Sequence, residues 1–167
     1  MMQRKNIRDI SMTDWCMLAK KGAAPPVRIP LEGSSMQPLI RRGKDLVTIA
    51  PLQGLLKKGD VVLFMTDSGR YVVHRIWKIK EKQVRTLGDN CVIPDAWIPK
   101  EYVLGQAICY SRNGRKHRLD TCFARLWGRA WMAIFPVRVV YIRLRKYAGC
   151  CYRKLCKNCT GGDSNER

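Results

Sequence analysis

Short apolar runs alternate with turn-forming residues through most of the chain. The runs cover residues 27–31, 46–50, 61–65, 71–79, 84–87, 102–110 and 117–119. Asp67-Ser68-Gly69 and Asn113-Gly114 separate neighbouring runs, and glycine at such points accepts the positive φ of a tight hairpin. The pattern predicts an all-β domain built from hairpins, arranged as a partly closed β-barrel or a folded sheet.

The segments on either side of this region have helical spacing. Ile7, Ile10, Trp15 and Leu18 recur at roughly helical steps, which predicts a short amphipathic helix within residues 6–20. The following residues, 22–26, are rich in glycine, alanine and proline and predict a stiff linker.

A second amphipathic helix is expected between Cys122 and Tyr147. Its apolar positions recur at three- and four-residue steps: Phe123, Leu126, Trp127, Ala130, Trp131, Ile134, Val137 and Tyr141. Arginines lie between them, and Pro136 should kink or split the helix. Tryptophan beside an arginine-rich flank is typical of a helix in a membrane interface. Alternatively, the helix covers an open edge of the β domain.

The net charge of +19 is concentrated in the C-terminal part of the chain. Residues 1–111 carry 18 Lys/Arg against 10 Asp/Glu, whereas residues 112–158 carry 13 Lys/Arg and one acid, Asp120. Such a positive segment attracts an anionic membrane surface or nucleic acid. No nucleic-acid motif accompanies the charge, so we expect residues 121–148 to contact an anionic membrane rather than nucleic acid.

These patterns divide the chain into four parts. They are an N-terminal helix and linker (1–26), a β domain (27–120), a basic amphipathic helical segment (121–148) and a cysteine-containing tail (149–167). Neither a secretory h-region after Met1 nor any run of about 18 uncharged apolar residues is present. We therefore expect a peripheral membrane protein or, alternatively, a cytoplasmic one.

The eight cysteines do not have the spacing of a secreted disulfide scaffold. Cys16, Cys91, Cys109 and Cys122 lie among apolar neighbours, which is typical of small buried side chains. The other four, Cys150, Cys151, Cys156 and Cys159, lie in the tail and include one Cys-x-x-Cys. A structural metal site usually has two such pairs, so we expect no metal and no cofactor.

Ser35 and His74 are the residues with the strongest indication of chemistry. A serine hydroxyl becomes a nucleophile only when a base within hydrogen-bond reach takes its proton. The chain has two histidines, and His117 lies in a polar basic run where solvation is the default. His74 lies in an apolar strand, where a lone histidine is usually a core residue. Ser35 follows Gly33, which permits close approach of the backbone.

Four ordered motifs between residues 28 and 110 resemble the type I signal peptidase family. Gly33-Ser34-Ser35-Met36-Gln37-Pro38 is similar to its serine box, and Val73-His74-Arg75-Ile76 resembles its second box. Gly88-Asp89-Asn90 matches the box that follows, and Asp95 matches a further acid. A histidine in the second box is typical of the endoplasmic-reticulum, archaeal and sporulating-bacterial members. The family belongs to the signal peptidase and repressor-autopeptidase superfamily.

This resemblance implies that Ser35 is the nucleophile and His74 the general base. Asp95 would orient or charge-stabilise His74, with Asp89 as the competing candidate for that role or as a structural support. Many members carry a serine two residues before the nucleophile, where this chain has Gly33. Losing one oxyanion donor typically costs about 10²–10³ in turnover. A substrate peptide would add as a strand beside residues 28–33 and 70–73, where the candidate contacts are Ile29, Leu31, Gly33, Met36, Tyr71 and Val73.

The implied function is a serine endopeptidase that removes signal or leader peptides from precursor proteins. Small residues, often alanine, would be expected at the cleavage site. The alternative is a non-catalytic module that retains the peptidase fold and binds membrane or other polyanions through its basic C-terminal segment. A self-cleaving repressor is disfavoured because it requires a Ser-Lys pair and an Ala-Gly cleavage site upstream of the serine.

Overall fold

The computed structural model describes residues 11–145 and 147. The expected helical positions Ile7 and Ile10 and the four tail cysteines lie outside the described residues. The chain divides into two compact units, one ending at Met132 and the other starting at Ala133. The candidate functional residues all belong to the first unit.

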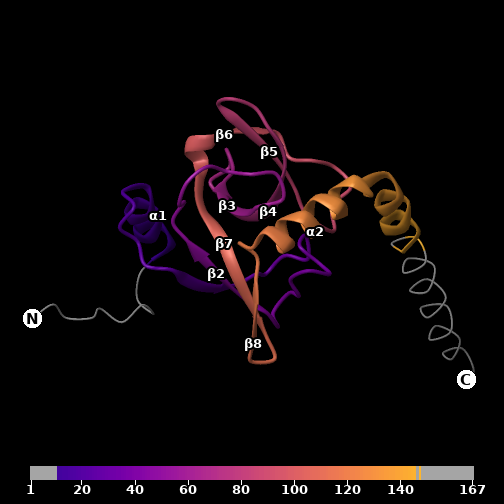
Figure 1. Cartoon of the computed structure of the whole chain (residues 1–167), viewed down its shortest axis with the longest axis horizontal. Helices are drawn as coiled ribbons and strands as arrows, with labels where there is room; N and C mark the ends of the chain where they lie inside the picture. Colours follow the sequence, from indigo (N-terminus) through magenta and orange to yellow (C-terminus); the bar gives the residue numbers. More distant parts are fainter. Residues whose placement is uncertain (1–10, 146, 148–167) are drawn as a thin grey trace, which may run out of the picture. The chain divides into compact units, whose positions relative to one another are not determined.

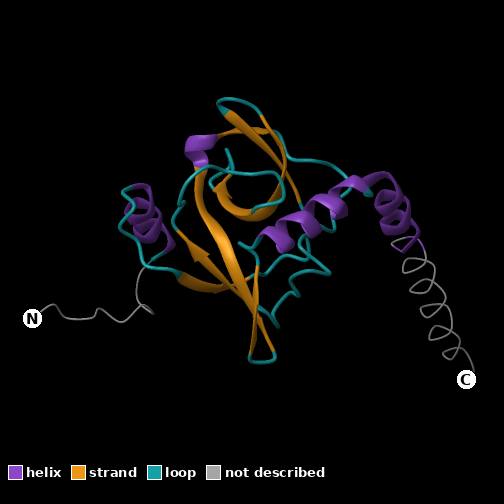
Figure 2. Ribbon diagram, in the orientation of Figure 1, coloured by secondary structure: helices purple, strands orange, loops and turns teal. Residues whose placement is uncertain are grey.

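A single antiparallel sheet of eight strands forms the body of the first unit (Figures 1 and 2). The strands are β1 (Val27–Pro30), β2 (Leu46–Ala50), β3 (Val61–Met65), β4 (Tyr71–Ile79), β5 (Gln83–Leu87), β6 (Trp97–Pro99), β7 (Val103–Arg112) and β8 (Arg115–Arg118). Their order is β1-β2-β7-β3-β4-β5-β6, and β8 pairs with β7. The predicted hairpin-built all-β domain is confirmed.

Of the two expected arrangements, a partly closed barrel or a folded sheet, the strand order favours the folded sheet. The sheet does not close into a barrel, because β1 and β6 are the two ends of the path and do not pair with each other. The long strand β7 links its two halves, since residues 106–111 pair with β2 and residues 103–106 pair with β3. The register shifts in both pairings, which is how a sheet bends without closing.

The side chains of β3 are buried on both faces of the sheet. Val61 and Leu63 belong to one hydrophobic cluster, whereas Val62 and Phe64 belong to another. Successive side chains of a strand point to opposite faces, so the continuous apolar sequence of β3 fills two cores at once. Strand β6 was missed in the sequence because it contains only three residues, one of them proline.

Helix α1 (Met12–Lys20) packs against the sheet through Trp15. Its N-terminus is capped by the Ser11 hydroxyl, which accepts a hydrogen bond from the Asp14 amide. The Trp15 side chain is buried and donates from Nε1 to the Pro25 carbonyl oxygen at 2.7 Å. A side chain at Gly105 would collide with Trp15 and with the backbone of β2, so this position in β7 requires glycine.

Helix α2 (Cys122–Ala133) follows β8, and all of it except Ala133 belongs to the first unit. The helical run is interrupted at Ile134 and resumes at residue 135. The predicted break therefore occurs just before Pro136, which lies in the first turn of the next helical segment, where proline is tolerated. Within the described part of the chain, no helix is both long and apolar enough to cross a membrane.

Asp45 fixes the end of the loop that carries Ser35. Its carboxylate, which is fully buried, accepts hydrogen bonds from the Arg41 amide and from the Arg112 guanidinium. Burial alone would raise the pKa of Asp45, but the hydrogen bonds from Arg112 and Arg41 outweigh it and lower the pKa to about 2. Arg112 also donates to the Leu39 carbonyl oxygen, so one ion pair connects this loop to β7.

We expect Asp45→Asn to lower the free energy of unfolding by about 2 kcal/mol at neutral pH. The folded-state pKa lies below the unfolded value of 3.8, so the ionised form stabilises the fold above about pH 4. That contribution is lost as the pH falls towards 2. Urea unfolding of both proteins from pH 7 down to pH 2.5 measures it. A difference that stays constant over this range would contradict the assignment to ionised Asp45.

Candidate active site

Three chain segments bring the predicted site residues together. Ser35 lies in the loop after β1, His74 in the middle of β4, and Gly88-Asp89-Asn90 directly after β5. Strands β4 and β5 are paired neighbours, with Arg75 opposite Leu87. The sheet therefore fixes the spacing between His74 and the Gly88 turn, and the Ser35 loop packs onto this pair.

His74 is held by Asp95. The imidazole Nδ1 lies 2.7 Å from the Asp95 carboxylate Oδ2. The same oxygen accepts a hydrogen bond from the Thr86 hydroxyl at 2.6 Å. When Asp95 accepts a hydrogen bond from Nδ1–H, the neutral ring has its lone pair at Nε2, the state required of a general base. The His74 side chain is 9% exposed and that of Asp95 is 30% exposed.

The loop that carries Asp95 is itself attached to β5. The Asp95 amide donates to the Thr86 carbonyl oxygen, and Arg85 Nε donates to the Asp95 carbonyl oxygen at 2.9 Å. Both backbone groups of Asp95 are therefore bonded to the strand that neighbours β4. These bonds explain how an aspartate 21 positions from His74 in sequence reaches its ring.

Gly88 separates the Ser35 backbone from the His74 ring. A Cβ placed on Gly88 would lie 2.8 Å from the Ser35 carbonyl oxygen and 3.0 Å from His74 Nε2. It would also lie 2.7 Å from the Cys91 sulfur. Any side chain here would push these groups apart, so glycine permits Ser35 and His74 to approach.

Asp89 does not contact His74 but forms a buried ion pair with Arg75. Its two carboxylate oxygens accept hydrogen bonds from Arg75 Nε at 3.0 Å and Nη2 at 2.8 Å. Arg75 Nη1 donates to the Gly59 carbonyl oxygen. Both side chains are almost completely buried. Of the two expected roles of Asp89, this geometry favours structural support, because both carboxylate oxygens accept hydrogen bonds from Arg75.

Asn90 attaches the Ser35 loop to the Gly88 turn. Its backbone amide donates to the Ser35 carbonyl oxygen at 2.7 Å, and its side-chain Nδ2 donates to the Ser34 carbonyl oxygen. Met36 and Ile40 also anchor the loop, because their side chains are fully buried in the core. The backbone around Ser35 is thus fixed on both sides.

The Ser35 hydroxyl itself makes no hydrogen bond among the described residues. Its Oγ lies 3.9 Å from the position that a Cβ on Gly33 would take, and the side chain is partly exposed. A rotation about its Cα–Cβ bond changes the direction of this hydroxyl without moving the loop. Catalytic hydrogen bonds are often long in unliganded enzymes and shorten in the substrate complex.

The expected substrate contacts divide into surface and core positions. Ile29, Leu31 and Tyr71 are partly or largely accessible, and Gly33 is exposed. Met36 is completely buried and Val73 is almost so. For Met36 the expectation is corrected: its side chain supports the loop from the core and is not available to a bound peptide.

Sequence reasoning missed two groups at this site. Thr86 was not expected, although its hydroxyl shares the Asp95 oxygen with His74 and its side chain is fully buried. The sequence signal for Thr86 was a polar residue at a position of β5 whose side chain points into the domain. Cys91 was interpreted as a small buried residue, yet it is only partly buried and lies beside Gly88. Cys109 is likewise partly buried, and Cys122 is exposed.

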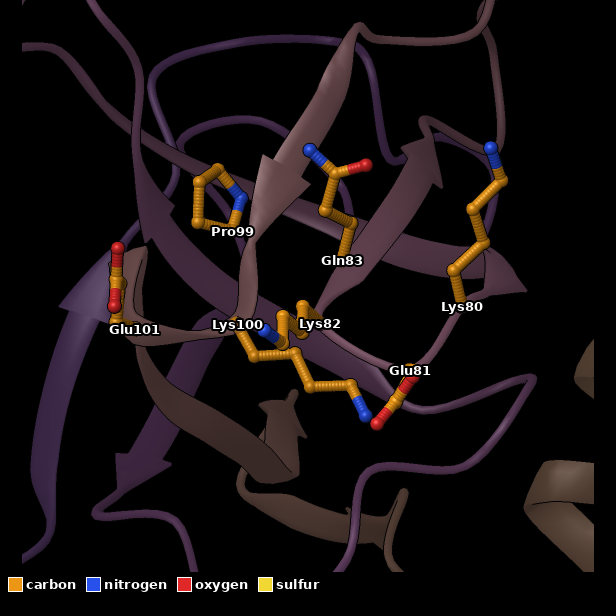
Figure 3. Close-up of a pocket in the computed structure, with 7 residues that line it drawn as sticks. All are labelled: Lys80, Glu81, Lys82, Gln83, Pro99, Lys100 and Glu101. Carbon is orange, nitrogen blue, oxygen red and sulfur yellow. The ribbon is translucent and has the colours of Figure 1, made fainter.

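One cavity is remote from Ser35 (Figure 3). It lies at the far end of the β4–β5 hairpin and has a volume of ≈ 680 Å³. Its lining is mixed in charge, and Figure 3 shows Lys100 extending towards Glu81. Lys80, in this cavity, is six positions beyond His74, which is about 20 Å along a strand. No group of three or more metal-ligating side chains is found within the described ranges.

No protein-family model matches the chain, and no curated protein matches it.

We expect Asp89→Asn and Asp95→Asn to differ strongly in stability. Removing the Asp89 charge leaves Arg75 buried without a counter-ion, which typically costs about 3–5 kcal/mol. Asp95 is partly exposed, so its replacement should cost about 1 kcal/mol or less. Urea denaturation followed by circular dichroism measures both. Equal losses in the two variants would contradict the separate roles of the two aspartates.

Proposed function

We propose that the protein is a serine endopeptidase with the fold and catalytic residues of a histidine-type signal peptidase. Ser35 Oγ attacks the carbonyl carbon of a peptide bond while His74 Nε2 takes its proton. His74 then gives that proton to the leaving amine, which releases the C-terminal fragment. Water hydrolyses the Ser35 ester, releases the N-terminal fragment and regenerates the hydroxyl.

The observation that supports this proposal best is the His74–Asp95 hydrogen bond together with the Gly88 contact. An aspartate at 2.7 Å directs the histidine Nε2 towards the side where the Ser35 backbone lies. A histidine that served only the core would not require a carboxylate, a threonine and a glycine arranged around it. The exposed position of Ser34 and the partial exposure of Ser35 leave room for a peptide.

Two strand edges near Ser35 support binding of an extended peptide. Strand β1 pairs only with β2, and Tyr71 to His74 of β4 pair with β3 but not with β5. Unpaired backbone groups on a strand edge recruit an extended segment as an additional strand. Ile29 and Leu31 beside one edge and Tyr71 beside the other would then contact the side chains of a precursor.

We expect Ser35→Ala to lower cleavage of a precursor with an Ala-x-Ala site by about 10⁴-fold or more, since the nucleophile is lost. Ser34→Ala is the matched control, because Ser34 is the exposed neighbour in the same loop and should retain activity. Product formation is measured by mass spectrometry with purified protein in lipid vesicles. Full activity in Ser35→Ala would refute the assignment. Cleavage by neither wild type nor variant would favour the non-catalytic membrane-binding alternative.

The two histidines provide a second matched pair. We expect His74→Gln to abolish cleavage because the Ser35 hydroxyl then loses its general base, and Asp95→Asn to reduce it by up to about 10⁴-fold. His117→Gln should leave activity unchanged, since His117 is exposed on β8 and stacks on Tyr110 at 4.8 Å. The same cleavage assay measures all three. An equal loss in His117→Gln would contradict a specific role for His74.

A further inference from the structure

Three large apolar side chains on one face of α2 are exposed. Phe123, Leu126 and Trp127 are 77%, 63% and 60% exposed, and their spacing places them on one side of the helix. A helix on the surface of a soluble domain normally turns its apolar stripe towards the core. Here all three side chains stay largely exposed, although Trp127 also lines a small cavity with Pro38 and Leu39. The packing of the first unit therefore does not account for the exposure of the stripe.

The opposite face of α2 is docked on the sheet domain through glycine and arginine. A Cβ on Gly128 would collide with the Arg75 guanidinium, and a Cβ on Gly59 would lie 2.8 Å from the Arg125 carbonyl oxygen. Arg125 Nη1 also lies 3.9 Å from the Asp60 carboxylate. These close backbone contacts set which face of α2 is inward, and therefore which face is outward.

The exposed stripe belongs to a positively charged part of the first unit. Residues 112–132 contain six Lys/Arg and a single acid, Asp120, whose carboxylate is paired with Arg118 at 2.9 Å. An apolar stripe with tryptophan, within a cationic segment, matches the boundary between anionic headgroups and acyl chains. An acidic protein would satisfy the arginines but would not require three exposed apolar side chains next to them.

We propose that Phe123, Leu126 and Trp127 of α2 bind the protein to the surface of an anionic lipid bilayer. The helix lies in the plane of the interface, with these side chains inserted among the acyl chains and the arginines near the headgroups. Because α2 is docked on Arg75, next to His74, lipid binding holds the sheet domain at the membrane surface. The binding itself does not depend on peptidase activity.

The test is flotation of the full-length protein with lipid vesicles. Vesicles of phosphatidylglycerol and phosphatidylcholine are compared with vesicles of phosphatidylcholine alone. We expect wild type to bind the anionic vesicles, and the double variant Leu126→Gln, Trp127→Gln to bind about tenfold more weakly or worse. Neither substitution changes the net charge, so the loss reports insertion and not electrostatic attraction.

The matched control is the double variant Leu55→Gln, Ile93→Gln. These residues are 88% and 76% exposed and lie in loops outside α2. This control should bind as wild type does, and circular dichroism checks that both double variants are folded. No binding of wild type to anionic vesicles, or equal binding by wild type and the α2 variant, would overturn the proposal. So would an equal loss in the control. A wild-type dimer that dissociates in the α2 variant, without lipid binding, would assign the stripe to a second copy.

Discussion

The buried ion pair between Arg75 and Asp89 is the interaction on which the rest of the first unit depends. Arg75 lies next to His74 on β4, and Asp89 lies next to Gly88 after β5. Their two hydrogen bonds therefore join β4, which carries His74, to the Gly88 turn, which packs against the Ser35 loop. The third bond of Arg75 reaches Gly59, and Gly128 of α2 covers the guanidinium.

This ion pair also explains why two nearby aspartates have different roles. Adjacent side chains on a strand point to opposite faces, so His74 and Arg75 contact different partners. Asp89 is buried with Arg75 and has both oxygens occupied, whereas Asp95 lies at the rim and accepts from His74 and Thr86. Breaking the buried pair would leave an uncompensated charge, so the site depends on it without using it chemically.

The sequence predicted the sheet well because its signals are local. Alternating runs and the Asp-Ser-Gly and Asn-Gly turns determine strands and hairpins over a few residues, and seven of the eight strands were anticipated. The open path from β1 to β6 was not predictable in this way, because closure depends on register shifts between distant strands. The orientation of α2 could not be predicted either, because an apolar stripe on a helix does not show which face of the helix packs against the domain.

The candidate site was predicted as a set of residues but not as a set of contacts. Ser35, His74, Gly88 and Asp95 were identified from the ordered motifs, and the structure brings them together. Which aspartate contacts His74 depends on the buried position of Arg75, which no motif specified. Met36 was expected to contact substrate, yet its side chain is fully buried in the core.

Trapping of the covalent intermediate tests the central claim most directly. The protein is mixed with a precursor peptide, quenched in acid within the first turnovers, digested and examined by mass spectrometry. The account predicts an ester between Ser35 and the N-terminal fragment of the peptide, absent in Ser35→Ala. Cleavage with the fragment attached to another residue, such as a thioester at Cys91, or with no Ser35 ester at any quench time, would contradict it.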